Sequence, residues 1–190
     1  MTSIPFILLS ALLAAAVWHD VRARRIPNAV VFPGMLAALV LQAFLPAGGL
    51  LGTSMGATGI ASALGGLGLG LAILMPMYAL RLMGAGDVKL LAMVGAFVGT
   101  DHIVAVSLAT LLAGGVLALA VAASQGSLRR LLGNTRQMVV YTGLSALAGF
   151  MEPAVAPAAP ASGRLPYAIA IASGTVGCLL WLCLVGELPL

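Results

Sequence analysis

The sequence predicts an all-α, polytopic membrane protein with about six transmembrane helices, and three observations lead to this fold class. Charged residues make up only 7% of the 190 residues, whereas a soluble domain has about 25%. Hydrophobic residues make up 62%, which excludes intrinsic disorder because disordered chains have low hydrophobicity. The few charges are separated by apolar runs, several of them long enough for a membrane helix, which needs about 20 residues.

The first three spans are predicted in the N-terminal part of the chain. Residues 2–19 contain no Asp, Glu, Lys or Arg, and neither a basic start nor an A-x-A cleavage site marks them as a signal peptide. The uncharged run over 26–80 is long enough for two further spans, 28–45 and 57–80. A turn rich in Pro and Gly at 46–49 separates them.

The fourth span must include charged residues. The uncharged stretch between Lys89 and Asp101 is too short to cross a bilayer, so the span has to extend back through Asp87. The last three spans are predicted at 82–100, 102–124 and 165–186. Segment 125–164 combines a basic amphipathic stretch with several prolines, and we expect it to lie at the cytosolic membrane surface. Its apolar part, 137–151, is interfacial or re-entrant.

The positions of the charges predict the topology. With six spans, all nine Lys and Arg fall in loops on one side of the membrane, and the other side holds Asp101 and Glu187. Because basic loops stay in the cytosol, both termini are expected on the outer side and 1–190 forms one membrane-embedded domain. The same rule explains the net charge of +4 without a nucleic-acid partner, and the lipid bilayer is the expected surrounding. The sequence carries no signal for an oligomeric state.

Two aspartates are predicted to meet at the cytosolic end of the bundle. The first span runs inward and ends at Asp20, and the fourth runs outward and begins near Asp87. A structural interpretation makes Asp20 a solvated loop charge and Asp87 a helix N-cap. However, a carboxylate at a helix C-terminus faces the negative end of the dipole, and the short fourth span draws Asp87 below the membrane surface. Ionisable groups there are costly and tend to be functional.

A pair of carboxylates at close range supports a specific chemistry. The two groups share a proton and titrate together. One can take a proton from water while the other protonates a substrate carbonyl, as in aspartic proteases. This chemistry needs no cofactor and no metal. The two cysteines, Cys178 and Cys183, are too few for a four-cysteine zinc site.

Three short motifs surround these aspartates. Residues 84–87 read G-x-G-D and lead to Lys89, Asp20 stands shortly before the Ile-Pro-Asn turn at 26–28, and Pro166 opens the last span. Together they resemble the type IV prepilin peptidases, membrane aspartyl proteases of the GxGD class. The resemblance covers about residues 4–186.

The resemblance implies an endopeptidase of the bacterial cytoplasmic (inner) membrane. It would cleave prepilin-like proteins between a basic leader and a hydrophobic segment, at the cytosolic face. By the family pattern, Asp20 and Asp87 are the catalytic pair. The residues that shape the motifs are Gly84, Gly86, Lys89, Pro27 and Asn28. The chain has no C-x-x-C motif, so it is similar to the short form without a methyltransferase domain, as in tight-adherence (Flp-type) pilus systems.

Other functions are compatible with part of this pattern. The main alternative is a proton- or ion-coupled transporter or channel, since intramembrane aspartates can relay protons, although both aspartates are expected at one face. A structural membrane subunit and a presenilin-type intramembrane protease are the others. His19 could tune Asp20, but a histidine at a helix end is more often structural.

Overall fold

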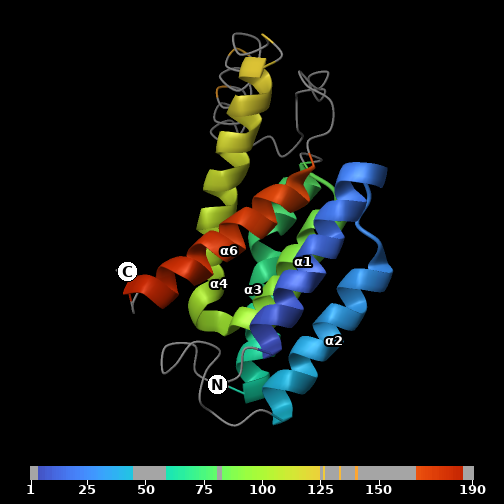
Figure 1. Ribbon diagram of the computed structural model, residues 1–190, viewed down its shortest axis with the longest axis vertical. Coiled ribbons are helices and arrows are strands. Elements are labelled where there is room, and N and C mark those ends of the chain that lie inside the picture. The colour runs from blue at the N-terminus through green and yellow to red at the C-terminus, as the bar shows by residue number, and fades with distance from the viewer. Residues whose placement is uncertain are drawn as a thin grey trace. The chain divides into compact units, whose positions relative to one another are not determined.

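The computed structural model describes residues 4–44, 59–80, 83–124 and 166–185, with isolated positions at 126, 133 and 140. These residues form helices and no strand, which confirms the predicted helical class (Figure 1). The helices are α1 (Ile4–Ala23), α2 (Asn28–Phe44), α3 (Gly59–Ala79), α4 (Ala85–Ser124) and α6 (Tyr167–Val185). The predicted turn at 46–49 and nearly all of the predicted interfacial segment lie outside the described residues.

The composition of the helices fits a membrane protein. Helices α1, α3 and α4 are long and apolar enough to cross a bilayer, and α2 and α6 are apolar but shorter. Helix α1 extends past the predicted end at residue 19 to Ala23, because the chain leaves the right-handed helical conformation only at Arg24, where φ is 51°. The number of six spans and the outer position of both termini stay predictions.

Helix α4 is interrupted at Gly99. A straight helix of its 40 residues would be about 60 Å long, about twice the hydrocarbon thickness of a bilayer. Gly99 has φ 75° and ψ −176°, a conformation open to glycine, and the chain turns back there (Figure 1). Gln42 Nε2 donates to the Phe97 carbonyl at 3.1 Å, and the Thr100 amide donates to Ser62 Oγ at 3.0 Å. These bonds satisfy backbone groups beside the break, as an apolar surrounding requires.

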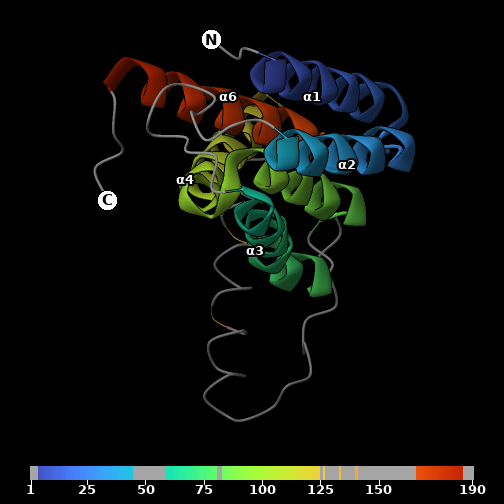
Figure 2. The same ribbon diagram turned by 90° about the horizontal axis from the view of Figure 1, so that it is seen from below.

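The chain divides into two compact units, residues 1–114 with 166–190, and residues 115–165. In the first unit α1 packs against α2 and α6, and α2 packs against α3 (Figure 2). In the second unit the structure describes the end of α4, where Ser124 Oγ donates to the Val121 carbonyl at 2.9 Å, and three isolated positions. All candidate site residues in the described ranges belong to the first unit.

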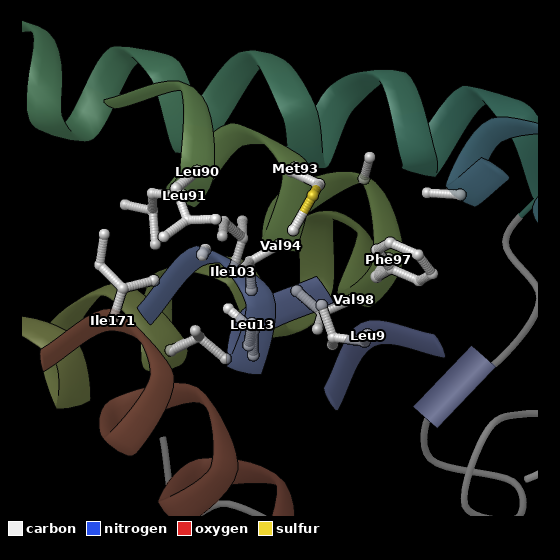
Figure 3. Packing of buried hydrophobic residues seen from close by; sticks show 14 of the residues in the cluster. Leu9, Leu13, Leu90, Leu91, Met93, Val94, Phe97, Val98, Ile103 and Ile171 are labelled. Carbon is white, nitrogen blue, oxygen red and sulfur yellow. The ribbon is translucent and has the colours of Figure 1, made fainter. Parts of the chain in front are cut away.

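The first half of α4 forms the centre of the first unit. Residues 90–99 are all buried. Leu9 and Leu13 from α1 and Ile171 from α6 belong to the same buried cluster (Figure 3). A helix that is apolar on every face is stable only when neighbours or lipid surround it. The position of this central helix therefore determines where Asp87, at its beginning, lies.

Glycines let α3 approach this central helix closely. A Cβ atom on Gly66 would overlap the Gly95 carbonyl oxygen, and one on Gly70 would lie 2.8 Å from the Leu91 carbonyl oxygen. Backbones can come this close only where a side chain is missing, as small-x-x-x-small pairs allow in membranes. This contact fixes the position of α4 along the axis of α3.

Candidate active site

Asp20 is buried near the end of α1, with only 7% of its surface exposed. Its Oδ2 atom accepts a hydrogen bond of 3.1 Å from the amide of Ala168, the second residue of α6. The first amides of a helix have no partner within the helix, and the positive end of its dipole favours an anion. The start of α6 therefore offsets the unfavourable position of Asp20 near the end of its own helix.

The turn after Asp20 is tightly built. The Arg24 amide donates to the Asp20 carbonyl at 2.8 Å, and Arg24 has φ 51°. A residue in this left-handed region ends a helix by bonding back to the last carbonyls. The Pro27 carbonyl then accepts the Val30 amide at 3.0 Å, and α2 begins at Asn28. The Ile-Pro-Asn motif thus connects the helix of Asp20 directly to the next helix.

Asp87 is the third residue of α4 and closes its first turn. Its Oδ2 atom accepts the Gly84 amide at 3.2 Å, and its own amide donates to the Gly84 carbonyl at 3.2 Å. This is how the acidic residue of a capping box bonds, so Gly84, rather than Asp87, occupies the N-cap position. Gly86 packs against the Ile-Pro-Asn turn, since a Cβ on it would lie 3.2 Å from Ile26 Cβ.

Lys89 joins the G-x-G-D motif to the Ile-Pro-Asn turn. Its Nζ donates to Asn28 Oδ1 at 3.2 Å and lies 5.3 Å from the centre of the Phe32 ring. Both partners belong to α2, so the ammonium group is engaged there. Lys89 and Gly86 together attach the beginning of α4 to the beginning of α2.

The two aspartates lie within electrostatic reach of one another. The negative charge of Asp20 acts on Asp87, and that of Asp87 acts on the phenol of Tyr167, the first residue of α6. Three helices therefore contribute to one group of polar residues. The sequence interpretation missed Tyr167 and the Ala168 amide. The only signal for them was the motif that opens with Pro166.

His19 takes no part in this group. Its Nδ1 lies 2.8 Å from the Ala15 carbonyl, one turn earlier in α1, and its ring is exposed. The structural interpretation of this histidine therefore describes it better than a role in tuning Asp20. Within the described ranges, no three His, Cys, Asp or Glu residues gather closely enough to hold a metal ion.

Both carboxylates are bound in the same way. In Asp20 and in Asp87 the Oδ2 atom accepts a backbone amide, and a carboxylate keeps further acceptor sites beside such a bond. Two such carboxylates can divide the work of base and acid in the hydrolysis of a peptide bond.

Comparison with known proteins supports this chemistry. The model of the type IV leader peptidase family matches residues 7–119, more than half of the chain. The match includes both aspartates, the Ile-Pro-Asn turn and the G-x-G-D motif with Lys89. Neither the curated proteins nor the solved structures yielded a match. The chain belongs to the type IV leader peptidase family.

Proposed function

We propose that this protein is an aspartic endopeptidase that removes the leader of prepilin-like proteins, with Asp20 and Asp87 as its catalytic pair. The observation that carries the proposal is that the Ile-Pro-Asn turn, which follows the buried Asp20, packs through Ile26 against Gly86 beside Asp87, so that these two carboxylates lie in the same region of the structure. They come from different helices, and the family match includes both. The basic leader and the hydrophobic segment of the substrate would lie on either side of the scissile bond.

The reaction needs both carboxylates in different protonation states. The ionised member removes a proton from water while the water oxygen attacks the carbonyl carbon of the scissile bond. The protonated member gives its proton to the carbonyl oxygen. The carboxyl group that took the proton from water then passes it to the leaving nitrogen as the C–N bond breaks, and a hydroxyl of the tetrahedral intermediate returns a proton to the other carboxylate as the carbonyl re-forms. Close carboxylates share one proton, so the pair starts in the state that this sequence requires.

The location follows from the distribution of charge. All nine Lys and Arg fall on one predicted side of the membrane, and the positive-inside rule makes that side the cytosol. Asp20 precedes a basic turn and Asp87 precedes Lys89, so the pair belongs to this side. We infer a multi-pass protein of the bacterial cytoplasmic membrane.

Co-expression with a candidate Flp-type prepilin tests the proposal. The wild-type chain should shorten the prepilin on a gel. Asp20→Asn and Asp87→Asn should each abolish this shortening while the variants still insert into the membrane. Asp101→Asn is the matched control, because this exposed aspartate lies beyond the break in α4 and should leave processing intact.

Full processing by either Asn variant at position 20 or 87 would exclude the dyad. A transporter would instead be favoured by two results together. The wild type would transport protons in liposomes without cleaving the leader, and both variants would lose this transport.

A further inference from the structure

The exposed face of α1 changes from apolar to basic towards the C-terminal end of the helix. Exposed residues recur along it at intervals of three or four positions, which places them on one face. This stripe consists of Ile4, Ile7, Ala11, Ala14, Trp18, Val21 and Arg22. Every member before Arg22 is apolar or aromatic. Arg22 lies in the last turn of the helix, and Arg24 and Arg25, which follow it, are also exposed.

The Arg22 side chain is stacked on the Trp18 ring. Its guanidinium carbon lies 4.4 Å from the ring centre, a favourable distance for a cation over an aromatic face. No carboxylate pairs with Arg22 in the described part of the chain, because the nearby Asp20 is buried and accepts the Ala168 amide of α6. A guanidinium that is stacked on a ring can still bind a phosphate through its N–H groups. The stack therefore presents a cation in a restrained position without a counter-ion.

The length of α1 places this pair at the level of the lipid headgroups. The helix rises about 27 Å between Ile4 and Arg22, which is close to the hydrocarbon thickness of a bilayer, roughly 30 Å. Helix α1 is apolar enough to cross the membrane. When its apolar stripe faces the acyl chains, Trp18 lies at the interface, where tryptophan is enriched, and Arg22 lies among the phosphates.

An anionic phospholipid matches both parts of this surface. Its acyl chains fit the apolar stripe, and its phosphate fits Arg22, with further positive charge from Arg24 and Arg25. A free phosphate ion would use the basic end alone, and a soluble acidic protein would leave the apolar stripe uncovered. The basic leader of the proposed substrate would be repelled here, because like charges at short range disfavour one another.

We propose that Trp18 and Arg22 form a binding site for the headgroup of an anionic phospholipid, and that Arg24 and Arg25 add to its positive charge. The bound lipid contacts the exposed face of α1, whereas Asp20 is turned into the protein. The inference goes beyond the proposed function and does not depend on peptidase activity. It can therefore be tested by binding alone.

Tryptophan fluorescence provides the test, because Trp18 and Trp181 are the two tryptophans of the chain. The full-length Trp181→Phe protein is reconstituted in phosphatidylcholine vesicles with increasing fractions of brominated phosphatidylglycerol or brominated phosphatidylcholine, which quench nearby tryptophans. Trp18 should prefer the anionic lipid at least fivefold, the factor expected for one arginine at a membrane surface. Arg22→Gln should lower this preference about fivefold, and the further changes Arg24→Gln and Arg25→Gln should remove it.

The Trp18→Phe protein is the matched control. It reports on Trp181, an exposed residue of α6, whose last turn carries no basic residue, and both lipids should quench it equally. Equal quenching of Trp18 by the two lipids, or a preference that Arg22→Gln leaves unchanged, would overturn the inference. The same preference at Trp181 would show a general effect of the vesicle surface and would also overturn it. Displacement of the lipid by inorganic phosphate would show a site for the ion alone and contradict the assignment to a lipid.

Discussion

Two substitutions of Asp20 separate its structural role from its proposed catalytic role. Asp20→Ala removes both the charge and the acceptor of the Ala168 amide. Asp20→Asn removes the charge but keeps an oxygen that can accept this amide. Both variants should lose leader cleavage, because neither can exchange a proton with water. Only Asp20→Ala should lose substantial stability.

The structure gives the size of the difference. Ala168 is fully buried, so an amide left without its acceptor costs about 1–3 kcal/mol. Loss of the anion at the start of α6 adds about 0.3–1 kcal/mol. The sum for Asp20→Ala is roughly 1.3–4 kcal/mol. For Asp20→Asn the lost dipole interaction is offset by relief of the repulsion from Asp87, so we expect a change within about 1 kcal/mol.

Thermal unfolding in detergent, followed by tryptophan fluorescence, measures this difference. One kcal/mol corresponds to a Tm change of about 2–4 °C for a protein of this size. Asp20→Ala should therefore melt roughly 3–16 °C below the wild type, and Asp20→Asn within about 4 °C of it. Equal melting temperatures of the two variants would contradict the assigned bond to Ala168. Cleavage by Asp20→Asn would contradict the catalytic role.

Further predictions concern the contacts that hold the site. Gly66→Ala should lower the free energy of unfolding by about 1–3 kcal/mol through overpacking against α4. Gly68→Ala, with no described atom near its Cβ, should raise it by up to about 1 kcal/mol. Thermal unfolding in detergent checks both, and an equal change would refute the packing. In a gel assay of prepilin cleavage, Lys89→Met and Asn28→Ala should each slow the reaction several-fold. The double variant should be no slower than either single variant, because the two residues act through one hydrogen bond. Additive losses would show that they have separate roles. Gly86→Ala should reduce cleavage with little loss of membrane insertion, because its Cβ would press on Ile26. The measurement is the fraction of prepilin cleaved, compared with the amount of the variant in the membrane.

The helical class and the neighbourhood of the aspartates could be predicted from the sequence because charge is scarce in this chain. Each charge interrupts an apolar run, so the runs themselves mark the spans, and the interruption at Asp101 falls two residues from the observed break at Gly99. The end of α1 was harder to predict. It depends on the left-handed conformation of Arg24, and nothing in an arginine side chain signals such a conformation.

The partners of the site residues could not be predicted in the same way. The bond from Ala168 to Asp20 joins residues that are 148 positions apart, and the donor is a backbone amide, which every residue except proline carries. A sequence pattern can mark the carboxylate but cannot mark such a donor. The close packing of Tyr167 in α6 against Gly114 in α4 could not be predicted for a similar reason, since it requires that a side chain be missing.

Hydrogen bonds connect the three sequence motifs to one another in the structure. The first motif binds the third, because Asp20 accepts the Ala168 amide. The second binds the first, because Lys89 donates to Asn28. Both other motifs thus restrain the first, and a pair of carboxylates that repel one another is held together by contacts with neighbouring groups. A change in the exposed contact between Lys89 and Asn28 should therefore alter the geometry of the pair more than the stability of the fold, whereas loss of the buried bond between Ala168 and Asp20 should affect both.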